Sequence, residues 1–374
     1  MRTSDLRPQT PDVDPGKKHG LAQRQPPGCQ LEGPLLRLLP FWRQRSGGLT
    51  VGQTGPSPPG AGSYHVPVLL TEITEIFRPL EEGTIVDATF GGGGHSTALL
   101  DSLPDLSILA IDRDPDSLAI ASQSARLRLV AGDFADLDRL IRDHTEARAG
   151  SDEPGWFSPV AGVLFDLGVS SHQLDVAERG FSYRRAGPLD MRMDRRSDLS
   201  AAVIVNEWPE ADIATAIRTY GEERFARRIA SGIVAARPID DTARLASVVA
   251  EAVPAPARRR RHPARRVFQA IRIAVNDELG SLAAGLDAAL DAVRTGGRVA
   301  VITYHSLEDR IVKRRFAVGT AGCECPPGLP VCVCGKVAEL RSLTRGGVTP
   351  SADEVARNRR ARSARLRAVE KVAS

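Results

Sequence analysis

A run of four glycines at the start of a helical segment is the first feature of the sequence that could hold a ligand. Gly91 to Gly94 follow Asp87, in a short run rich in β-branched and apolar residues (83–90, GTIVDATF) that predicts a strand. Glycines at such a turn let the backbone approach a ligand closely, and the N–H groups of the following helix can hold a polar group. Asp112 ends the next predicted strand, where a carboxylate can accept both hydroxyls of a ribose. The pattern predicts a nucleoside site, and a plain tight turn with a surface aspartate is the alternative.

The glycine spacing argues against a dinucleotide as the ligand. A dinucleotide fingerprint needs a third glycine three residues after the second, and Ser96 or Thr97 stands there in this chain. An adenosyl ligand without phosphates suits the site better, and S-adenosylmethionine is one. It also carries a sulfonium cation, which Asp87 and Asp166, at the ends of two predicted strands, would face.

The elements that must position these residues alternate between strand and helix. Short β-rich runs precede helical patterns at 83–90, 106–114, 127–134 and 161–171. Strands that alternate with helices predict βαβ units and a parallel sheet with helices on both faces. Residues 179–282 show helical patterns only, and 296–316 return to a strand followed by a helix. We therefore predict an α/β domain that is interrupted by an all-helical insertion.

Several segments, taken in order, resemble one protein family closely. They are DATFGGGGHS, AIDRDP, FDLGVSSHQLD, ERGFSYR with GPLDMRMD, YGEERFARRIA, HPARRVFQAIRIAVNDEL, GGRVAVITYHSLEDRIVKRRF and ARNRRARSARLRA. From about His65 to Arg367 the chain resembles the bacterial S-adenosylmethionine-dependent methyltransferases that methylate the exocyclic N4 of a cytosine in 16S ribosomal RNA. The resemblance implies a Rossmann-like methyltransferase fold with an inserted helical domain. It also implies a cytoplasmic location and a target in the decoding region of small-subunit particles.

The resemblance divides the chain into a series of regions. It implies a methyltransferase domain formed by 63–178 and 266–345, a helical, substrate-recognising insertion at 179–265, and a basic C-terminal tail at 346–374. Residues 1–62 hold 10 of the 26 prolines and little apolar periodicity, so that burial cannot offset the entropy of ordering them. We interpret residues 1–62 as a disordered extension or as the product of an upstream start site.

The resemblance also assigns the S-adenosylmethionine pocket position by position. It implies that His95 contacts the methionine end and the ribose, that Asp112 holds the ribose hydroxyls, and that Phe134 lies along the adenine. Taken alone, His95 is as typical of a helix cap, and Phe134 of a hydrophobic core. The full set of implied cofactor residues is Gly93, Gly94, His95, Asp112, Phe134, Asp166 and Gln173.

Methylation of a cytosine amine makes specific demands on the site. N4 is a weak nucleophile because its lone pair is delocalised into the ring, and transfer requires this nitrogen about 3–3.5 Å from the methyl carbon, in line with the departing sulfur. Many amino-methylating enzymes place an Asp/Asn-Pro-Pro-aromatic sequence at a strand end, whereas this chain reads DLGVSS there. The acceptor candidates for the N4 proton are Asp166, Ser170 and Asp190. Asp190 and Asp194 flank Arg192, which is equally typical of a loop held by Asp–Arg pairs.

The ends of the chain are basic, although its net charge is only +4. Residues 1–62 carry +4 and residues 336–374 carry +6, which leaves −6 for 63–335. Basic runs either contact a phosphate backbone or form solvated faces, and charge alone does not decide between them. His305, in TYHSLED, would orient the target base or serve a structural role. The candidate RNA-backbone contacts are Arg179, Arg184, Arg265, Arg266 and the C-terminal ARNRRARSARLRA.

Four of the five cysteines are crowded into one short segment, as Cys323, Cys325, Cys332 and Cys334. Four thiolates could hold zinc tetrahedrally, but C-x-C pairs are less usual than C-x-x-C pairs and the resemblance does not require them. Zinc binding and adventitious thiols therefore both stay open. Five cysteines are too few for a disulfide framework in 374 residues, and no apolar run approaches the roughly 18–20 residues that cross a bilayer. These features predict a cytoplasmic protein without a membrane partner.

Two other functions fit parts of the pattern. A nicotinamide-dependent oxidoreductase shares the order of strand, glycine turn, helix and aspartate, although it requires the missing third glycine. A non-catalytic ribosome-assembly factor would keep the cofactor pocket without turnover. We favour the RNA methyltransferase, with ribosomal RNA rather than DNA as its partner, and leave the oligomeric state open, with a homodimer as one alternative.

Overall fold

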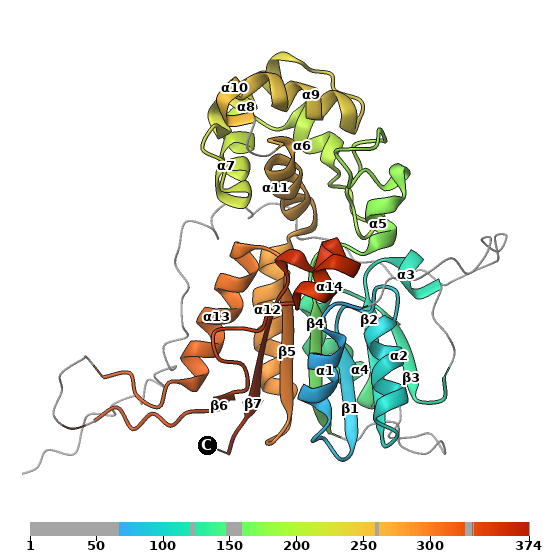
Figure 1. Ribbon diagram of the computed structural model, residues 1–374, viewed down its shortest axis with the longest axis vertical. Helices are drawn as coiled ribbons and strands as arrows, with labels where there is room; N and C mark the ends of the chain where they lie inside the picture. Colours follow the sequence, from blue (N-terminus) through green and yellow to red (C-terminus); the bar gives the residue numbers. More distant parts are fainter. Residues whose placement is uncertain are drawn as a thin grey trace, which may run out of the picture. The chain divides into compact units, whose positions relative to one another are not determined.

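The computed structural model describes residues 67–119, 124–146, 159–258, 262–325, 331 and 333–373 (Figure 1). All of them belong to one compact unit, Ser57–Ser374. The extension predicted at 1–62 lies outside the described residues. Among the helices that the structure describes, none combines the length and the apolar character needed to cross a membrane.

A seven-stranded sheet organises the α/β part of the chain. Its strands are β1 (Gly83–Asp87), β2 (Leu106–Asp112), β3 (Leu127–Ala131), β4 (Val160–Asp166), β5 (Arg298–Thr303), β6 (Leu340–Ser342) and β7 (Arg365–Lys371). They lie in the order β3-β2-β1-β4-β5-β7-β6, in which β1 to β5 are parallel and β7 runs antiparallel to β5 and β6. The order 3-2-1-4-5 is that of the Rossmann fold, whose ligands bind beyond the carboxyl ends of the strands where the order reverses. The predicted α/β, Rossmann-like fold is confirmed.

Helices cover both faces of this sheet. They include α1 (Leu70–Phe77), α2 (Gly94–Ser102), α3 (Pro115–Ala119), α4 (Leu137–Glu146), α12 (Glu278–Ala292), α13 (Ser306–Thr320) and the 3₁₀ helix η3 (Arg359–Ser363). Val86 of β1 shares a hydrophobic cluster with residues of α4, α12 and α13. Its neighbour Ile85 shares another cluster with residues of α1, α2 and η3. Because successive side chains of a strand point to opposite faces, these clusters lie on the two sides of the sheet, and the strands between them are almost continuously apolar.

A separate hydrophobic cluster joins the helices between β4 and β5. These helices are α6 (Ala201–Glu207), α7 (Glu210–Gly221), α8 (Ala226–Ala235), α9 (Thr242–Ala252), α10 (Ala255–Arg258) and α11 (Ala264–Asn276). Ile217 of α7, Ile229 of α8 and Ile271 of α11 are fully buried within the cluster. α11 therefore belongs to the helical unit, which runs to Asn276 rather than ending at the predicted boundary of 265. The apolar spacing of RRVFQAIRIAVN makes α11 one continuous amphipathic helix across that boundary.

The C-terminal residues do not form the basic tail that we predicted at 346–374. α14 (Ala352–Arg357) and η3 lead into β7, which pairs with both β5 and β6. Leu366 and Ala368 of β7 are almost fully buried, and the arginine between them, Arg367, places Nε 2.7 Å from a carboxylate oxygen of Asp309. The prediction was wrong because the arginines of RLRAVEK hide the alternation of a strand. The ion pair of Arg367 with Asp309 compensates part of their charge.

Candidate active site

A pocket of about 1040 Å³ lies beyond the carboxyl ends of β1, β2 and β4, where the strand order reverses. Its walls come from the glycine loop after β1, the 3₁₀ helix η1 (Phe134–Asp136), the loop after β4, α11 and η3. Asp190, a predicted acceptor, is not among its lining residues. Gly93, a predicted cofactor residue, is not among them either. The predicted cofactor and acceptor residues that line it are Gly94, His95, Asp112, Phe134, Asp166, Ser170 and Gln173, and His305 and Arg265 line it as well. The structure thus brings most of the predicted site together.

Two glycines give the loop after β1 its shape. Gly93 has a φ of 75°, a left-handed conformation that favours glycine, and a Cβ atom on it would lie 2.6 Å from the ring of Phe90. A Cβ atom on Gly94 would lie 2.5 Å from Pro67. Gly93 is the N-cap of α2 and brings no side chain to cap it. The first N–H groups of α2 are therefore left for a ligand or for water.

Asp112 ties the end of β2 to the glycine loop. Its Oδ2 accepts a hydrogen bond from the backbone N of Gly91 at 2.7 Å, and its Oδ1 accepts one from the N of Asp114 at 2.8 Å. Burial raises the pKa of Asp112 to about 6, although both backbone hydrogen bonds oppose the rise. Each oxygen of an ionised carboxylate has room for a second hydrogen bond. Asp112 can therefore accept from a ribose in the pocket while it holds the loop.

Phe134 lies at the start of η1, which follows β3, whereas the glycine loop follows β1 on the other side of β2. Its ring meets that of Phe165 edge to face, with the centroids 5.6 Å apart. A Cβ atom on Gly285 of α12 would lie 2.9 Å from the same ring, so glycine is required for α12 to pack this closely. These contacts hold the ring in place, and it still lines the pocket. A fixed aromatic ring of this kind is suited to pack against a flat heterocycle.

Asp166, at the end of β4, is held between a tyrosine and a histidine. Its Oδ1 accepts a hydrogen bond from the hydroxyl of Tyr304 at 2.8 Å, and its Oδ2 lies 3.5 Å from Nδ1 of His95. Burial raises the pKa of Asp166, and His95 and Tyr304 work against that rise. Burial and the nearby carboxylate also raise the pKa of Tyr304 well above its ordinary value, so that the phenol remains a donor.

The ring of His95 has a second partner. Its Nε2 lies 2.9 Å from the backbone O of Val68, and because a carbonyl oxygen only accepts, Nε2 is the donor of this hydrogen bond. Tyr304 is a residue that the sequence did not identify. Its place in TYHSLED, directly after β5, was the available signal.

Asp87 does not face the pocket as predicted. It is 1% exposed, and its Oδ2 accepts a hydrogen bond from the hydroxyl of Ser96 at 2.6 Å. Its Oδ1 accepts from the backbone N of Thr89 at 3.2 Å. Asp87 is absent from the pocket lining and instead supports the glycine loop through hydrogen bonds to residues on either side of it. The sequence could not distinguish it from Asp166 because both residues end strands.

Ser170 and Gln173 form the N-terminal cap of α5 (Ser171–Asp175). The Ser170 hydroxyl oxygen accepts from the N of Gln173 at 3.2 Å, and the Gln173 side-chain oxygen accepts from the N of Ser170 at 3.0 Å. The Gln173 amide nitrogen donates to Asp114 at 2.7 Å. Both side chains thus shape the pocket wall, and both are already engaged in the cap, which makes Ser170 less suited than Asp166 to act as a proton acceptor.

Arg179 was predicted to contact RNA, and this prediction was wrong. Its side chain is 1% exposed and lies 2.7 Å from a carboxylate oxygen of Asp114 and 2.8 Å from one of Asp116. A guanidinium enclosed in this way cannot reach a phosphate. Asp114 lies in the AIDRDP segment and Asp116 follows it directly, but counting charges along the chain gives no sign that they and Arg179 meet.

The Asp190 loop follows the alternative that we considered for it. Asp190 receives hydrogen bonds from its near neighbour Arg192, with Oδ1 at 2.7 Å from Nε. Burial acts to raise the pKa of Asp190, but the hydrogen bonds from Arg192 outweigh it and the pKa is lowered. Asp194 pairs with Arg196 at 2.8 Å rather than with Arg192. Asp190 is therefore engaged by Arg192 and, unlike Asp166, does not line the pocket.

A buried charged cluster supports the wall formed by α11, α12 and α13. Arg272 donates from Nε and Nη2 to the two carboxylate oxygens of Glu278, both at 2.7 Å. Glu308 accepts from the backbone N of Tyr304 at 2.8 Å and lies 3.1 Å from Nε2 of His305. His305 also caps α13 through Nδ1, at 3.4 Å from the N of Glu308. His305 thus caps α13, as its structural alternative predicts, and it also lines the pocket. The guanidinium already compensates the charge of Glu278, so we assign no metal to this cluster.

Exposed arginines line one edge of the pocket. Arg359, Arg360 and Arg362 of η3 line it together with Arg265, and the solvent reaches all four. The guanidinium of Arg360 lies 2.9 Å from a carboxylate oxygen of Asp175. Two other predicted RNA contacts are exposed as well: Arg266 lies 3.4 Å from Glu223, and Arg184 lies over the ring of Tyr183.

Known proteins resemble this chain over most of its length. The family model described as "MraW methylase family" matches residues 62–372. The "Ribosomal RNA small subunit methyltransferase H" of Symbiobacterium thermophilum is 52% identical over 314 residues, which cover 83% of this chain and 97% of that protein. The protein of the same name from Thermomicrobium roseum is 51% identical over 318 residues, which cover 83% and 94%.

The relative of that name from Mycobacterium tuberculosis aligns further towards the N-terminus. It is 47% identical over 378 aligned residues, covering 96% of this chain and 89% of the relative. Its alignment therefore includes much of the segment before residue 62, where the family model begins. A family match of this extent confirms the predicted resemblance and removes the nicotinamide-dependent oxidoreductase. With the Rossmann-like sheet and the pocket at its switch point, it shows that this chain belongs to the MraW methylase family of S-adenosylmethionine-dependent methyltransferases.

Proposed function

We propose that this chain methylates the exocyclic N4 of a cytosine in the decoding region of 16S ribosomal RNA, acting on small-subunit particles in the cytoplasm. Small-subunit ribosomal RNA is the substrate named for its relatives. One observation carries the assignment to an amine. Asp166, a hydrogen-bond acceptor oriented by Tyr304, lines the same pocket as the residues suited to a nucleoside.

The cofactor half of the pocket uses residues on both sides of β2. S-Adenosylmethionine supplies an electrophilic methyl group on its sulfonium when it is bound. Asp112 would accept from the ribose hydroxyls, and Phe134 would lie along the adenine. The N–H groups at the start of α2, beside Gly94, would hold the methionine end. All of these groups line one cavity, as an adenosyl ligand requires.

The acceptor half must make a weak nucleophile reactive. A hydrogen bond from N4–H to Oδ2 of Asp166 localises the nitrogen lone pair, while Tyr304 holds Oδ1 and so fixes the carboxylate plane. A C–N bond then forms as the C–S bond breaks, and the N4 proton passes to the carboxylate. Because burial raises the pKa of Asp166, it is a better proton acceptor than an exposed aspartate.

The edge of the pocket supplies the RNA contacts. Arg265 comes from α11 of the helical unit, and Arg359, Arg360 and Arg362 come from η3, so that two distant parts of the chain present cations at the same opening. Each neutralised phosphate releases counterions and adds affinity without sequence preference. This placement fits a structured RNA whose target base has to be turned into the pocket.

The proposal can be tested in cells that lack the chromosomal gene. Such cells would be complemented with the full-length wild type, with Asp166→Asn, or with Asp190→Asn as the matched control. N4-methylcytidine would then be measured by mass spectrometry in nucleosides from purified small-subunit ribosomal RNA. We expect the wild type and the control to restore the modification, and Asp166→Asn to slow it by about 10²–10⁴-fold, the usual contribution of a proton acceptor.

Two results would contradict the proposal. Full modification by Asp166→Asn, at equal protein levels, would remove Asp166 from the reaction. Restoration of growth without any modified cytidine by the wild type would instead support the non-catalytic assembly factor.

A further inference from the structure

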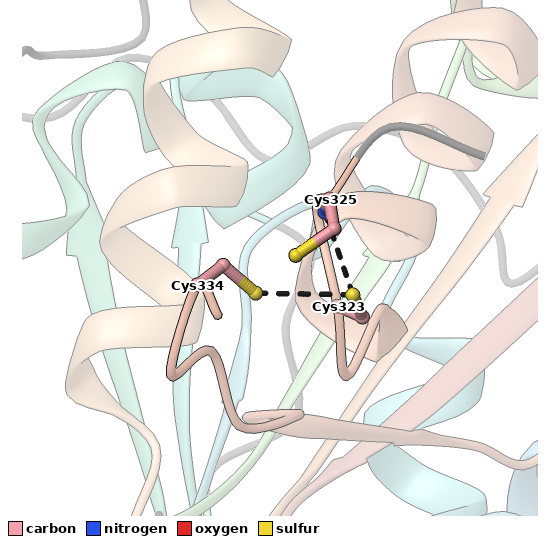
Figure 2. Close-up of side chains that lie close together, drawn as sticks. All are labelled: Cys323, Cys325 and Cys334. Carbon is pink, nitrogen blue, oxygen red and sulfur yellow. Dashed lines mark hydrogen bonds between the residues drawn. The ribbon is translucent and has the colours of Figure 1, made fainter. Parts of the chain in front are cut away.

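Three cysteines meet in the loop between α13 and β6, away from the pocket. Figure 2 shows Cys323 and Cys325 on one part of the loop and Cys334 on another, with their side chains directed towards one another. The three sulfur atoms all lie within 4.8 Å of one another, and those of Cys323 and Cys334 are 3.8 Å apart. None of the three residues lines the active-site pocket. The proposed methyl transfer gives this cluster no role.

The sulfur spacing matches that of a metal thiolate site. Zinc binds thiolate sulfur at about 2.3 Å in a tetrahedron, and the edge of such a tetrahedron is about 1.63 times that distance, or roughly 3.8 Å. The sulfur atoms of Cys323 and Cys334 are separated by this length. A disulfide bond would bring two sulfur atoms to about 2.05 Å. The cluster therefore has room for a metal ion among its sulfur atoms.

Backbone N–H groups already point at two of these sulfur atoms. The N of Cys325 donates to Sγ of Cys323 at 3.4 Å, and the N of Glu324 donates to Sγ of Cys334 at 3.5 Å. Zinc is bound by thiolate sulfur, and a zinc-bound thiolate can still accept hydrogen bonds from backbone N–H groups. The two hydrogen bonds are therefore compatible with Cys323 and Cys334 as zinc ligands.

Apart from one ion pair, few contacts hold the described part of this loop in shape. Val331, Val333 and Val337 are 71%, 78% and 59% exposed, so these apolar side chains contribute no core. A backbone hydrogen bond from the N of Glu339 to the O of Gly319 closes its base at 2.9 Å. A segment without a hydrophobic core is commonly ordered by a metal ion, whose binding energy becomes folding energy.

We propose that Cys323, Cys325 and Cys334 bind a structural Zn²⁺ ion that orders the loop between α13 and β6. The proposal rests on these three thiolates alone, because Cys332 lies outside the described residues. The site is independent of the methyl transfer and of the identity of its substrate.

The zinc content of the full-length protein tests this proposal. Protein expressed with zinc in the medium and purified without chelators would be analysed by elemental mass spectrometry as the wild type, Cys323→Ser, Cys334→Ser and Cys29→Ser. Cys29 is the cysteine that lies outside the segment 323–334, and it is the matched control. We expect one zinc per chain in the wild type and in Cys29→Ser. The two cluster variants should bind zinc at least about 100-fold more weakly, since loss of an outer-shell partner alone costs 10–100-fold.

Cobalt substitution tests the ligands even if a variant folds poorly. Wild-type protein loaded with Co²⁺ should show the thiolate-to-metal charge-transfer band and the visible bands of a tetrahedral site. S-Adenosylmethionine affinity would report the fold of each variant. A wild type without zinc and without cobalt bands would overturn the proposal, as would zinc retained in full by a Cys323→Ser/Cys334→Ser double variant.

Discussion

Asp112 offers the sharpest test of the cofactor site, through the variant Asp112→Ala. The carboxylate accepts from the backbone N atoms of Gly91 and Asp114, and in the complex it would also accept from two ribose hydroxyls. A hydrogen bond to a charged group contributes about 1.5–3 kcal/mol, so the two bonds together contribute about 3–6 kcal/mol. Because about 1.4 kcal/mol corresponds to a factor of ten, the Kd for S-adenosylmethionine should rise roughly 10²–10⁴-fold.

Isothermal titration calorimetry would measure this change, with Asp101→Ala as the control. Asp101 is an exposed aspartate on α2, and its loss should leave affinity unchanged. Burial disfavours the charged form of Asp112 and raises its pKa, so removing the carboxylate also removes a desolvation cost, and the variant should remain folded by circular dichroism. A Kd within threefold of the wild type in a folded Asp112→Ala variant would refute the assignment of the ribose to Asp112.

Three further outcomes follow from the same geometry. Since the pKa of Asp112 is raised to about 6 and its carboxylate is the binding form, cofactor affinity should be constant above pH 7 and fall about tenfold per pH unit below 6; a flat calorimetric profile from pH 5 to 8 would contradict this. Tyr304→Phe should slow methyl transfer about 10–100-fold through loss of the bond to Asp166, with an unchanged cofactor Kd, and an unchanged single-turnover rate would exclude it. Replacing the three η3 arginines by alanine should reduce the slope of log K against log salt for small-subunit RNA by about 2–3, without affecting the cofactor, and an equal slope would remove η3 from the interface. These arginines are Arg359, Arg360 and Arg362.

The sequence predicted those parts of the site that depend on local order along the chain. A glycine turn between a strand and a helix, with Asp112 at the end of the next strand, constrains which atoms meet at the switch point of a parallel sheet. Residues 94 and 112 line the pocket for this reason. The helical insertion was also predictable, because its apolar residues recur at helical spacing over a long segment.

Side-chain pairing across distant segments was not predictable in the same way. Arg179 meets Asp114 from a segment more than sixty residues away, and the hydroxyl of Tyr304 meets Asp166 across an even longer separation. No local pattern encodes such a pair. Whether Asp87 or Asp166 faces the pocket likewise depends on a hydrogen-bond partner. Ser96 engages the carboxylate of Asp87, which does not line the pocket.

The C-terminal strand shows a different limit. Basic residues dominate its composition, so that charge suggests a solvated tail, yet β7 completes the sheet between β5 and β6. Arg367 lies among the buried residues of this strand and is paired with Asp309, so a basic side chain can stand inside the sheet. The pairing partner, rather than the composition, decided the outcome.

The identity of the methylated nucleoside tests the central claim most directly. Purified full-length protein would be incubated with small-subunit particles that lack the modification and with S-adenosylmethionine carrying a labelled methyl group. The RNA would then be digested to nucleosides and analysed by chromatography and mass spectrometry. We predict label in N4-methylcytidine from a single site in the decoding region, incorporated about 10²–10⁴-fold more slowly when Asp166→Asn replaces the wild type. Label on a ring carbon, on a ribose or in another nucleoside would contradict the account.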